Sequence, residues 1–528
     1  MSFFRVILMS GLLLCSFGAL AQSTSLQSSA PKAFALAEPF AGTIVALQPD
    51  VQVQYLGTSR PMALADIGPS IGRVYVVAQK NGAVWRTAHL TFSPPSPGVR
   101  LSEDGSRLEF AAGEACPTGG LFDVAKAAIA PICGGRAELR MTVDGYRNSF
   151  DAVTDLLRDR LGGLGEQAIS LVKAARGDAD KEAADYGSSA EVASTSEERR
   201  PPPDAPLDAI LGKSFTQRLI ARGDQGVTLE EAAAGPLAIG RWYRSANQPG
   251  IFVSRITPRA VGHTLDPETF DAAVDLMAIA LDGVRLEYRV GTEHPRLDWA
   301  KWAQAQGKGP GPDGIGSTAP IARPGIVDAR DKPDLMAVFA GGFKRLHGAL
   351  QDGTYYGFVE DSVVLTRLRP GLVTLYATAD GVVSMDSWAG QPASPLLFAR
   401  QNGIPIVDKG VPGRRLEDRS ASWSTGVDGN PRTARGGACL IDGPKRFLVY
   451  GYFSSAVPRT MADVFVAYGC QSAMLLDMSR AALAYAAIHH DRGHETLTLA
   501  MKRGDPAKGA KFLDQADERD FFALFKAR

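Results

Sequence analysis

The sequence has no excess of charge of either sign, because 57 Lys and Arg residues balance 57 Asp and Glu residues. A balanced chain has no long-range attraction to nucleic acid or to an anionic membrane, so neither is expected as a partner. No CxxC pair or Cys/His spacing typical of zinc occurs, and no repeat indicates a solenoid. With 56 glycines, the composition is that of a loop-rich globular protein and excludes a fibre or a disordered chain.

Long apolar runs are also missing beyond the amino terminus, where none reaches the length of a membrane span. The first residues combine Arg5, an apolar stretch at 6–17 and a small-x-small site, Ala19-Leu20-Ala21. These are the features of a secretory signal peptide. We therefore predict that residues 1–21 are removed, and that the mature chain is exported, periplasmic or secreted, without an integral membrane segment.

Cysteine is scarce, and one of the five, Cys15, falls in the predicted signal peptide. The other four form an even number in an exported chain, which indicates two disulfides. Four cysteines allow three pairings. The nearest-neighbour pairing keeps each bridge within one domain and joins Cys116 to Cys133 and Cys439 to Cys470.

Two domains separated by a linker are predicted. Residues 22–176 contain strand-like runs at 51–55, 73–77 and 88–92, with Asn81-Gly82 as a tight turn, and end in a helical pattern. This indicates a β-rich domain with a trailing helix.

Residues 177–206 are rich in Ala, Glu, Asp and Ser and end in a proline run, which is typical of a linker. The second domain then covers 207–528. Its patterns predict strands at 251–256 and 284–290 and a helix at 267–281. The predicted fold class is α+β, with a mixed α/β second domain.

Three motifs in the second domain have the character of a site. An apolar run ends in Ala340-Gly341-Gly342-Phe343-Lys344, and another ends in Leu475-Leu476-Asp477; Arg432-Thr433-Ala434, followed by Gly436, lies between them. Paired glycines let the backbone approach a ligand closely, an arginine offers a fork of donors, and a strand end places a carboxylate at a pocket rim.

In order and spacing, these motifs resemble the phosphodiester glycosidase family over roughly residues 250–505, about half of the chain. Between the motifs, the resemblance implies a strand at 445–450 and a helix at 459–465. The resemblance implies a phosphodiester-glycosidase-like domain in which Arg432 holds a phosphate and Asp477 acts as a base or stabilises a cationic sugar. It also implies substrate contacts from Gly341, Gly342, Thr433 and Gly436. Trp423, among Ser and Thr residues upstream of Arg432, is the better tryptophan for stacking on a sugar, although core packing is the default for this residue type.

The implied function is exported hydrolysis of glycosyl phosphodiesters from a glycan or envelope component, so the expected partner is a carbohydrate or a glycosyl phosphodiester. The chain departs from the family pattern at Ala340, where the family has Asn, and at Met478-Ser479-Arg480, where it has glycines. The alternative is therefore a catalytically degenerate periplasmic glycan-binding protein on the same fold, and whether the chain is an enzyme stays open.

Two further interpretations concern ligands. Asp477 could instead cap a helix that starts at Ser479, because Asp accepts backbone donors at helix starts. The cluster from His489 to His494 invites a metal, but a polar hairpin turn is favoured because no one-face spacing supports a ligand set. No cofactor or metal ligands are assigned, and the sequence leaves open whether a divalent cation such as calcium assists.

Overall fold

The computed structural model describes residues 38–147 except 58, 111–112 and 123–126, a few residues of 152–168, and most of 240–527. The gaps in the last part are 241, 245–247, 294–312, 314–317, 344–355, 391, 417–422, 424–430, 480–482, 491–494 and 500–510. The predicted signal peptide at 1–21 and linker at 177–206 lie outside the described residues, so both boundaries stay predictions.

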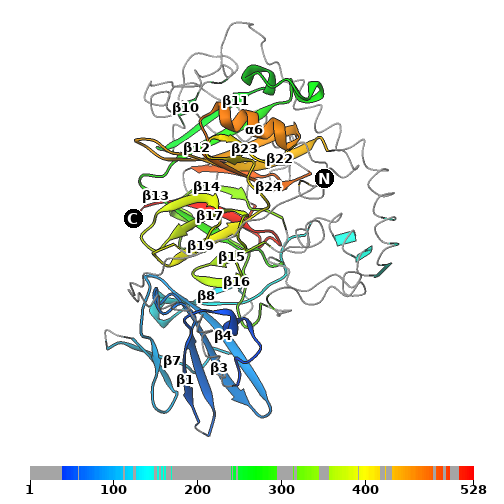
Figure 1. Cartoon of the computed structure of the whole chain (residues 1–528). Coiled ribbons are helices and arrows are strands. Elements are labelled where there is room, and N and C mark those ends of the chain that lie inside the picture. The colour runs from blue at the N-terminus through cyan, green and yellow to red at the C-terminus, as the bar shows by residue number, and fades with distance from the viewer. Residues whose placement is uncertain are drawn as a thin grey trace, which may run out of the picture. The chain divides into compact units, whose positions relative to one another are not determined.

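The described part is mostly β-strand, in several antiparallel sheets (Figure 1). The mixed α/β character expected for the second domain is not found, since the described residues after 240 contain a single α-helix, α6 (Pro458–Ala467). Short 3₁₀ turns are η1 (Ile44–Leu47), η2 (Cys133–Gly135), η3 (Pro258–Val261), η4 (Pro267–Thr269) and η5 (Lys332–Asp334). Among the described residues, no helix is both long and apolar enough to cross a membrane.

The first sheet confirms the strands expected in the amino-terminal region. It contains, in spatial order, β1 (Gln52–Leu56), β2 (Met62–Asp66), β3 (Val74–Asn81), β4 (Val84–Phe92), β9 (Ala137–Arg140) and β8 (Ile129–Ile132). The predicted hairpin is present, because Asn81 pairs with Val84 and Gly82 takes the positive φ of +61° that the turn requires. A small sheet is formed by the part of the chain between β4 and β8. It contains β5 (Arg100–Leu101), β6 (Arg107–Glu109) and β7 (Ala115–Pro117).

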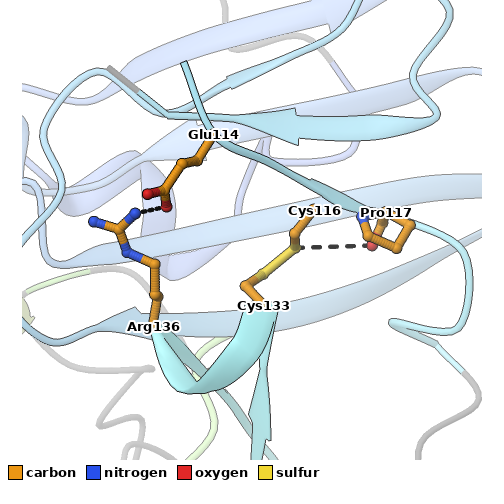
Figure 2. Close-up of a disulfide and its surroundings, with 5 residues drawn as sticks. All are labelled: Glu114, Cys116, Pro117, Cys133 and Arg136. Atoms are coloured by element: carbon orange, nitrogen blue, oxygen red, sulfur yellow. Dashed lines mark hydrogen bonds and ion pairs between the residues drawn. A yellow bond between two sulfur atoms is a disulfide. The ribbon is translucent and has the colours of Figure 1, made fainter. Parts of the chain in front are cut away.

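Both disulfides are present, in the nearest-neighbour pairing. Cys116 on β7 joins Cys133 at the start of η2, with Cα atoms 5.2 Å apart, and Figure 2 shows an ion pair between Arg136 and Glu114 beside it. Cys439 joins Cys470, with Cα atoms 5.7 Å apart. Both separations are ordinary for disulfides.

The largest sheet has eight strands. They are, in order, β10 (Tyr243–Arg244), β11 (Ile251–Ile256), β12 (Val274–Ala280), β23 (Phe447–Ala456), β22 (Thr433–Ile441), β24 (Ser472–Met478), β20 (Val407–Asp408) and β21 (Val411–Pro412). The predicted helix at 267–281 was wrong, since its second half is β12. This strand pairs on both edges and is covered on both faces, so it is apolar almost throughout and lacks the alternation that marks a half-exposed strand.

The helix α6 covers one face of this sheet (Figure 1). Gly437 and Gly451 are opposite each other on β22 and β23. A Cβ atom at Gly437 would lie 2.7 Å from Met461, and one at Gly451 would lie 3.1 Å from Phe465, and both of these are α6 residues. The two glycines therefore let the helix pack closely against the backbone of the sheet.

A five-stranded sheet packs on the other face. It contains β13 (Val284–Arg289), β27 (Phe521–Lys526), β14 (Leu335–Ala340), β25 (Ala486–His490) and β26 (Glu495–Leu499). The Phe339 ring lies 5.2 Å from that of Tyr450 on β23 and 4.9 Å from that of Phe522. β25 and β26 form the hairpin predicted for the histidine cluster, whose turn at 491–494 lies outside the described residues.

A further five-stranded sheet contains β16 (Val363–Thr366), β15 (Phe358–Glu360), β19 (Leu396–Gln401), β17 (Val373–Thr378) and β18 (Val383–Ser387). Tyr288 of β13 connects this sheet to the core, with its ring 6.4 Å from that of Phe358 and 5.1 Å from that of Phe522. The end of β19 therefore lies near two segments, namely the residues that follow β14 and the residues that precede β27.

Buried ion pairs join the first sheet to β13 and β15. Arg140 of β9 donates to Asp328 at 2.9 Å, and Asp361, directly after β15, lies 3.4 Å from both Arg73 and Arg289. Because the partners come from different sheets, the amino-terminal region is held by buried charges as well as by apolar packing. Burial of Glu360 in this cluster raises its pKa to about 7.

Candidate functional site

The paired glycines follow β14 directly, and their neighbours explain why no side chain is tolerated there. A Cβ atom at Gly341 would lie 2.4 Å from the nearest carboxylate oxygen of Asp520. One at Gly342 would lie 2.6 Å from Cγ of Asn402 and 2.8 Å from Nη2 of Arg400. Both distances are shorter than any real contact, so the glycines let these polar side chains lie directly on the backbone.

The hydrogen bonds of the two glycines are made within the protein. Gly341 donates its N–H to the Asp520 carbonyl at 2.9 Å, and Gly342 faces the Asp520 carboxylate at 3.4 Å. The resemblance implies substrate contacts from Gly341 and Gly342. In the structure they hold Asp520 in place.

Asp520 is the acceptor of a buried cluster at the start of β27. Its Oδ2 accepts from Nε of Arg400 at 2.5 Å and from the Tyr288 hydroxyl at 2.9 Å. Burial alone would lower the pKa of Arg400, but the charge of Asp520 more than offsets this and the pKa is raised. The arginine therefore stays cationic, and its guanidinium also lies 4.1 Å above the Phe358 ring.

Residues at the end of β19 connect the glycine segment to β24. Nη2 of Arg400 donates to the Phe343 carbonyl at 2.8 Å, and Oδ1 of Asn402 accepts from the Phe343 N–H at 2.9 Å. The Asn402 amide in turn donates to the Leu475 carbonyl at 2.6 Å. These bonds fix the spacing between the segment after β14 and the strand that bears Asp477.

Asp477 lies at a β-bulge. Arg435 pairs with Met478 and Gly437 pairs with Leu475, so one residue of β22, Gly436, is opposite two residues of β24. Bulges of this kind redirect side chains and are frequent beside active sites. The extra residue also lets the Asp477 N–H leave the β22 ladder and donate to the Gly341 carbonyl at 2.8 Å.

The Asp477 carboxylate is oriented from two sides. Its Oδ1 accepts the Met478 N–H at 3.0 Å and its Oδ2 accepts from Nη1 of Arg519 at 2.6 Å, while only 4% of the residue is exposed. Asp477 therefore belongs to β24 and to a salt bridge, and its described bonds are not those of a helix cap.

The backbone after Asp477 keeps the geometry of a glycine turn. Ser479 has φ +80°, in the left-handed region that side chains rarely adopt, and donates its N–H to the Ala434 carbonyl at 2.7 Å. Strain of this kind persists where the surrounding structure enforces it, and it is concentrated at functional sites. The turn after Asp477 is therefore formed with a serine in a backbone conformation that favours glycine.

Arg432 and Thr433 lie at the start of β22. Nε of Arg432 donates to Asp266 at 2.8 Å, and its Nη1 lies 3.4 Å from Glu268, both in the η4 segment. About a third of the Arg432 side chain, 29%, is exposed. Thr433 pairs with Ala456 across the hairpin. The described partners of Arg432 thus bind its side chain to the η4 segment. The residue itself directly precedes β22, the strand that carries Gly436.

Arg435 was not predicted, yet it is the fully buried arginine of this strand. It donates to the carbonyls of Trp423, Ala456 and Pro431 at 2.7, 2.8 and 2.9 Å, and burial lowers its pKa to about 9. Trp423 is itself buried, with its indole N–H donating to a backbone carbonyl at 2.7 Å. Its default role, core packing, is therefore the one observed.

No family model matches the chain, and no curated protein matches it. One similar solved structure is the zebrafish N-acetylglucosamine-1-phosphodiester alpha-N-acetylglucosaminidase catalytic domain, auto-inhibited by its pro-peptide, with 13% identity over 54% of this chain and 85% of that chain and a TM-score of 0.30.

Two others are a hypothetical protein from Synechocystis and a protein from Burkholderia pseudomallei described as exported. The first has 10% identity over 56% of this chain and 65% of that chain, with a TM-score of 0.28. The second has 10% identity over 48% of this chain and 74% of that chain, with a TM-score of 0.22. All three similarities are weak and distant, and they do not bear on which residues act.

Four partners in this region were missed by sequence reasoning: Arg400, Asn402, Arg519 and Asp520. One signal was available, because four consecutive ionisable residues at 517–520 directly precede the apolar run at 521–525, and all four are buried. Charges are almost never buried unless they are paired, so such a run beside a core strand indicates a polar cluster. Among the described residues, no group of three or more His, Cys, Asp or Glu side chains is arranged to hold a metal ion.

Proposed function

We propose that this chain is an exported hydrolase of glycosyl phosphodiesters, with Asp477 as its central residue. The observation that carries the proposal is the bulge opposite Gly436, which redirects Asp477 beside the paired glycines. Strain at Ser479 and the dense cluster of buried ionisable groups around Asp520 are two independent features typical of functional sites. The motif resemblance supplies the substrate class, and two disulfides support export.

The reaction would break the bond between an anomeric carbon and a phosphate oxygen. Asp477 would take a proton from the attacking water, whose oxygen bonds to the anomeric carbon, while the phosphate leaves with the bonding electron pair. Phosphate is a good leaving group, so a cation that neutralises it replaces much of the acid catalysis of other glycosidases. Arg432 would supply that cation by exchanging Asp266 or Glu268 for the substrate phosphate.

One observation favours the second candidate, glycan binding without cleavage. The Gly341 and Gly342 N–H groups are directed at Asp520, so the backbone donors expected for a substrate oxygen are already used. A binding protein would retain the shape of the site and lack turnover. The experiment below separates the two functions.

The test is release of free sugar from nucleotide sugars and N-acetylglucosamine 1-phosphodiesters, with calcium or with a chelator, by the signal-free protein. We expect Asp477→Asn to lower kcat by about 10²–10⁴-fold, the usual contribution of a general base. Arg432→Ala should also lower turnover, because a phosphate contact is lost. Both variants should still unfold cooperatively.

The matched controls are Asp442→Asn and Arg446→Ala. These residues form an exposed ion pair at 2.8 Å beyond the other end of β22, and their substitution should leave turnover unchanged. Full activity in Asp477→Asn would overturn the assignment of the catalytic base. Binding of the same compounds without release would replace the hydrolase with the glycan-binding protein.

A further inference from the structure

Tyr450 is a fully buried tyrosine in the middle of the eight-stranded sheet. Its ring packs on Phe339 of β14, with ring centroids 5.2 Å apart. Its hydroxyl, however, has no hydrogen-bond partner among the described residues. Buried hydroxyls are normally paired, and an exception in a native fold calls for a role that the fold alone does not supply.

The hydroxyl lies in the space left by the absent side chain of Gly436. A Cβ atom at Gly436 would be 2.7 Å from the Tyr450 oxygen and 3.0 Å from the Asp477 carbonyl oxygen. Since β22 runs between β23 and β24, Tyr450 reaches across Gly436 towards Asp477 on the far strand. Gly436 is therefore needed to bring the phenol and the bulged aspartate together.

The phenol is a neutral donor at this position. Burial is the main cause that raises its pKa well above the ordinary value, and the neighbouring Tyr452 and the charge of Asp477 add to the rise. Tyr450 therefore keeps its proton throughout the physiological range. The phenol lies close enough to Asp477 for the charge of the carboxylate to act on it, and one small polar molecule between the two groups can bond to both.

Two other buried tyrosines have hydroxyl groups that are paired within the fold, and they provide a comparison. The Tyr468 hydroxyl lies 2.9 Å from that of Ser254, and the Tyr288 hydroxyl donates to Asp520 at 2.9 Å. Both of these phenols have a partner in the fold. Tyr468 lies directly after α6 and its hydroxyl is paired with Ser254, which makes it a suitable control.

We propose that the Tyr450 hydroxyl binds and orients the water that attacks the anomeric carbon, with Asp477 as the base. This inference rests on the proposed hydrolysis and adds a residue to it. A water molecule is small enough to fit beside a buried hydroxyl, and it needs two to four polar partners, of which Tyr450 and Asp477 supply two. The water proton passes to the Asp477 carboxylate, and its oxygen bonds to the anomeric carbon as the phosphate departs.

The test compares Tyr450→Phe with Tyr468→Phe. Tyr450→Phe keeps the ring on Phe339 and removes only the hydroxyl, so its denaturation midpoint should equal or exceed that of the wild type. Its kcat should fall by about tenfold to a hundredfold with KM little changed, because water is misplaced and substrate binding is not. Tyr468→Phe should show the reverse pattern, with a lower midpoint and unchanged kcat.

Each other outcome has a defined meaning. Unchanged kcat in Tyr450→Phe, with an active wild type, overturns this inference and leaves the proposed hydrolysis intact. A clearly lower midpoint for Tyr450→Phe also overturns it, because the hydroxyl then has a structural partner. No turnover by the wild type on any compound, while Asp477→Asn is equally inactive, overturns the proposed function and this inference with it.

Discussion

Replacing Arg400 by methionine is expected to lower the free energy of unfolding by about 3–5 kcal/mol. Arg400 is completely buried and is the described cationic partner of Asp520, at 2.5 Å. Methionine would remove the buried cation that pairs with Asp520 and would remove the bond to the Phe343 carbonyl. Denaturant unfolding at neutral pH measures the loss.

Two further variants make this prediction specific. Arg446→Met removes an exposed arginine that has a carboxylate partner, and it should cost at most about 1 kcal/mol. The double variant Arg400→Met, Asp520→Asn should recover part of the loss, since the isolated buried charge is then absent. A single-variant loss below about 1 kcal/mol would contradict a buried ion pair at this position.

Glu360→Gln is expected to change the dependence of stability on pH. Burial, partly opposed by Arg289, raises the pKa of Glu360 from 4.5 to about 7. Between these values the folded protein holds a proton that the unfolded chain has released, so stability falls as pH rises through this window. The total change is at most about 3 kcal/mol, from 1.36 kcal/mol for each pKa unit. Glutamine imitates the protonated form and should remove this term.

The measurement is the difference in unfolding free energy between wild type and Glu360→Gln at pH 4.5 and at pH 8. A difference is needed because His89, whose pKa burial lowers to about 3, has the opposite effect: its contribution to stability is lost as pH falls below 6.5. The two slopes oppose each other in the wild type. Parallel pH curves for the two proteins would show that Glu360 is not the titrating group.

Local sequence patterns predicted a strand correctly where its apolar residues recur with the period of a strand. The strand at 251–256 is β11 and the run at 284–290 is β13 within one residue, while the helix that the resemblance implied at 459–465 is the centre of α6. The failure at 267–281 has a physical cause, because a strand covered on both faces loses its alternation. The fold class was consequently predicted with too much helix.

The candidate site could be predicted only in part. The motif resemblance brought Gly341 and Asp477 together, and the structure places them in direct backbone contact. Arg400 and Asp520 are 120 residues apart and meet only because β19 and β27 belong to packed sheets. Single-sequence patterns carry no signal for such pairs. The burial of Arg435 likewise results from tertiary packing, and the local sequence does not distinguish this residue from Arg432.

The bulge in β24 has a consequence for how the site is encoded. In a regular strand, neighbouring side chains alternate between the two faces of the sheet, so the position of a residue along the strand decides which face its side chain occupies. The two residues opposite Gly436 interrupt that alternation at Asp477. Deleting one residue upstream in β24 would restore a regular ladder and turn the carboxylate to the other face, although the aspartate itself would still be present. The position of the carboxylate thus depends on the number of residues in the strand as well as on their identity.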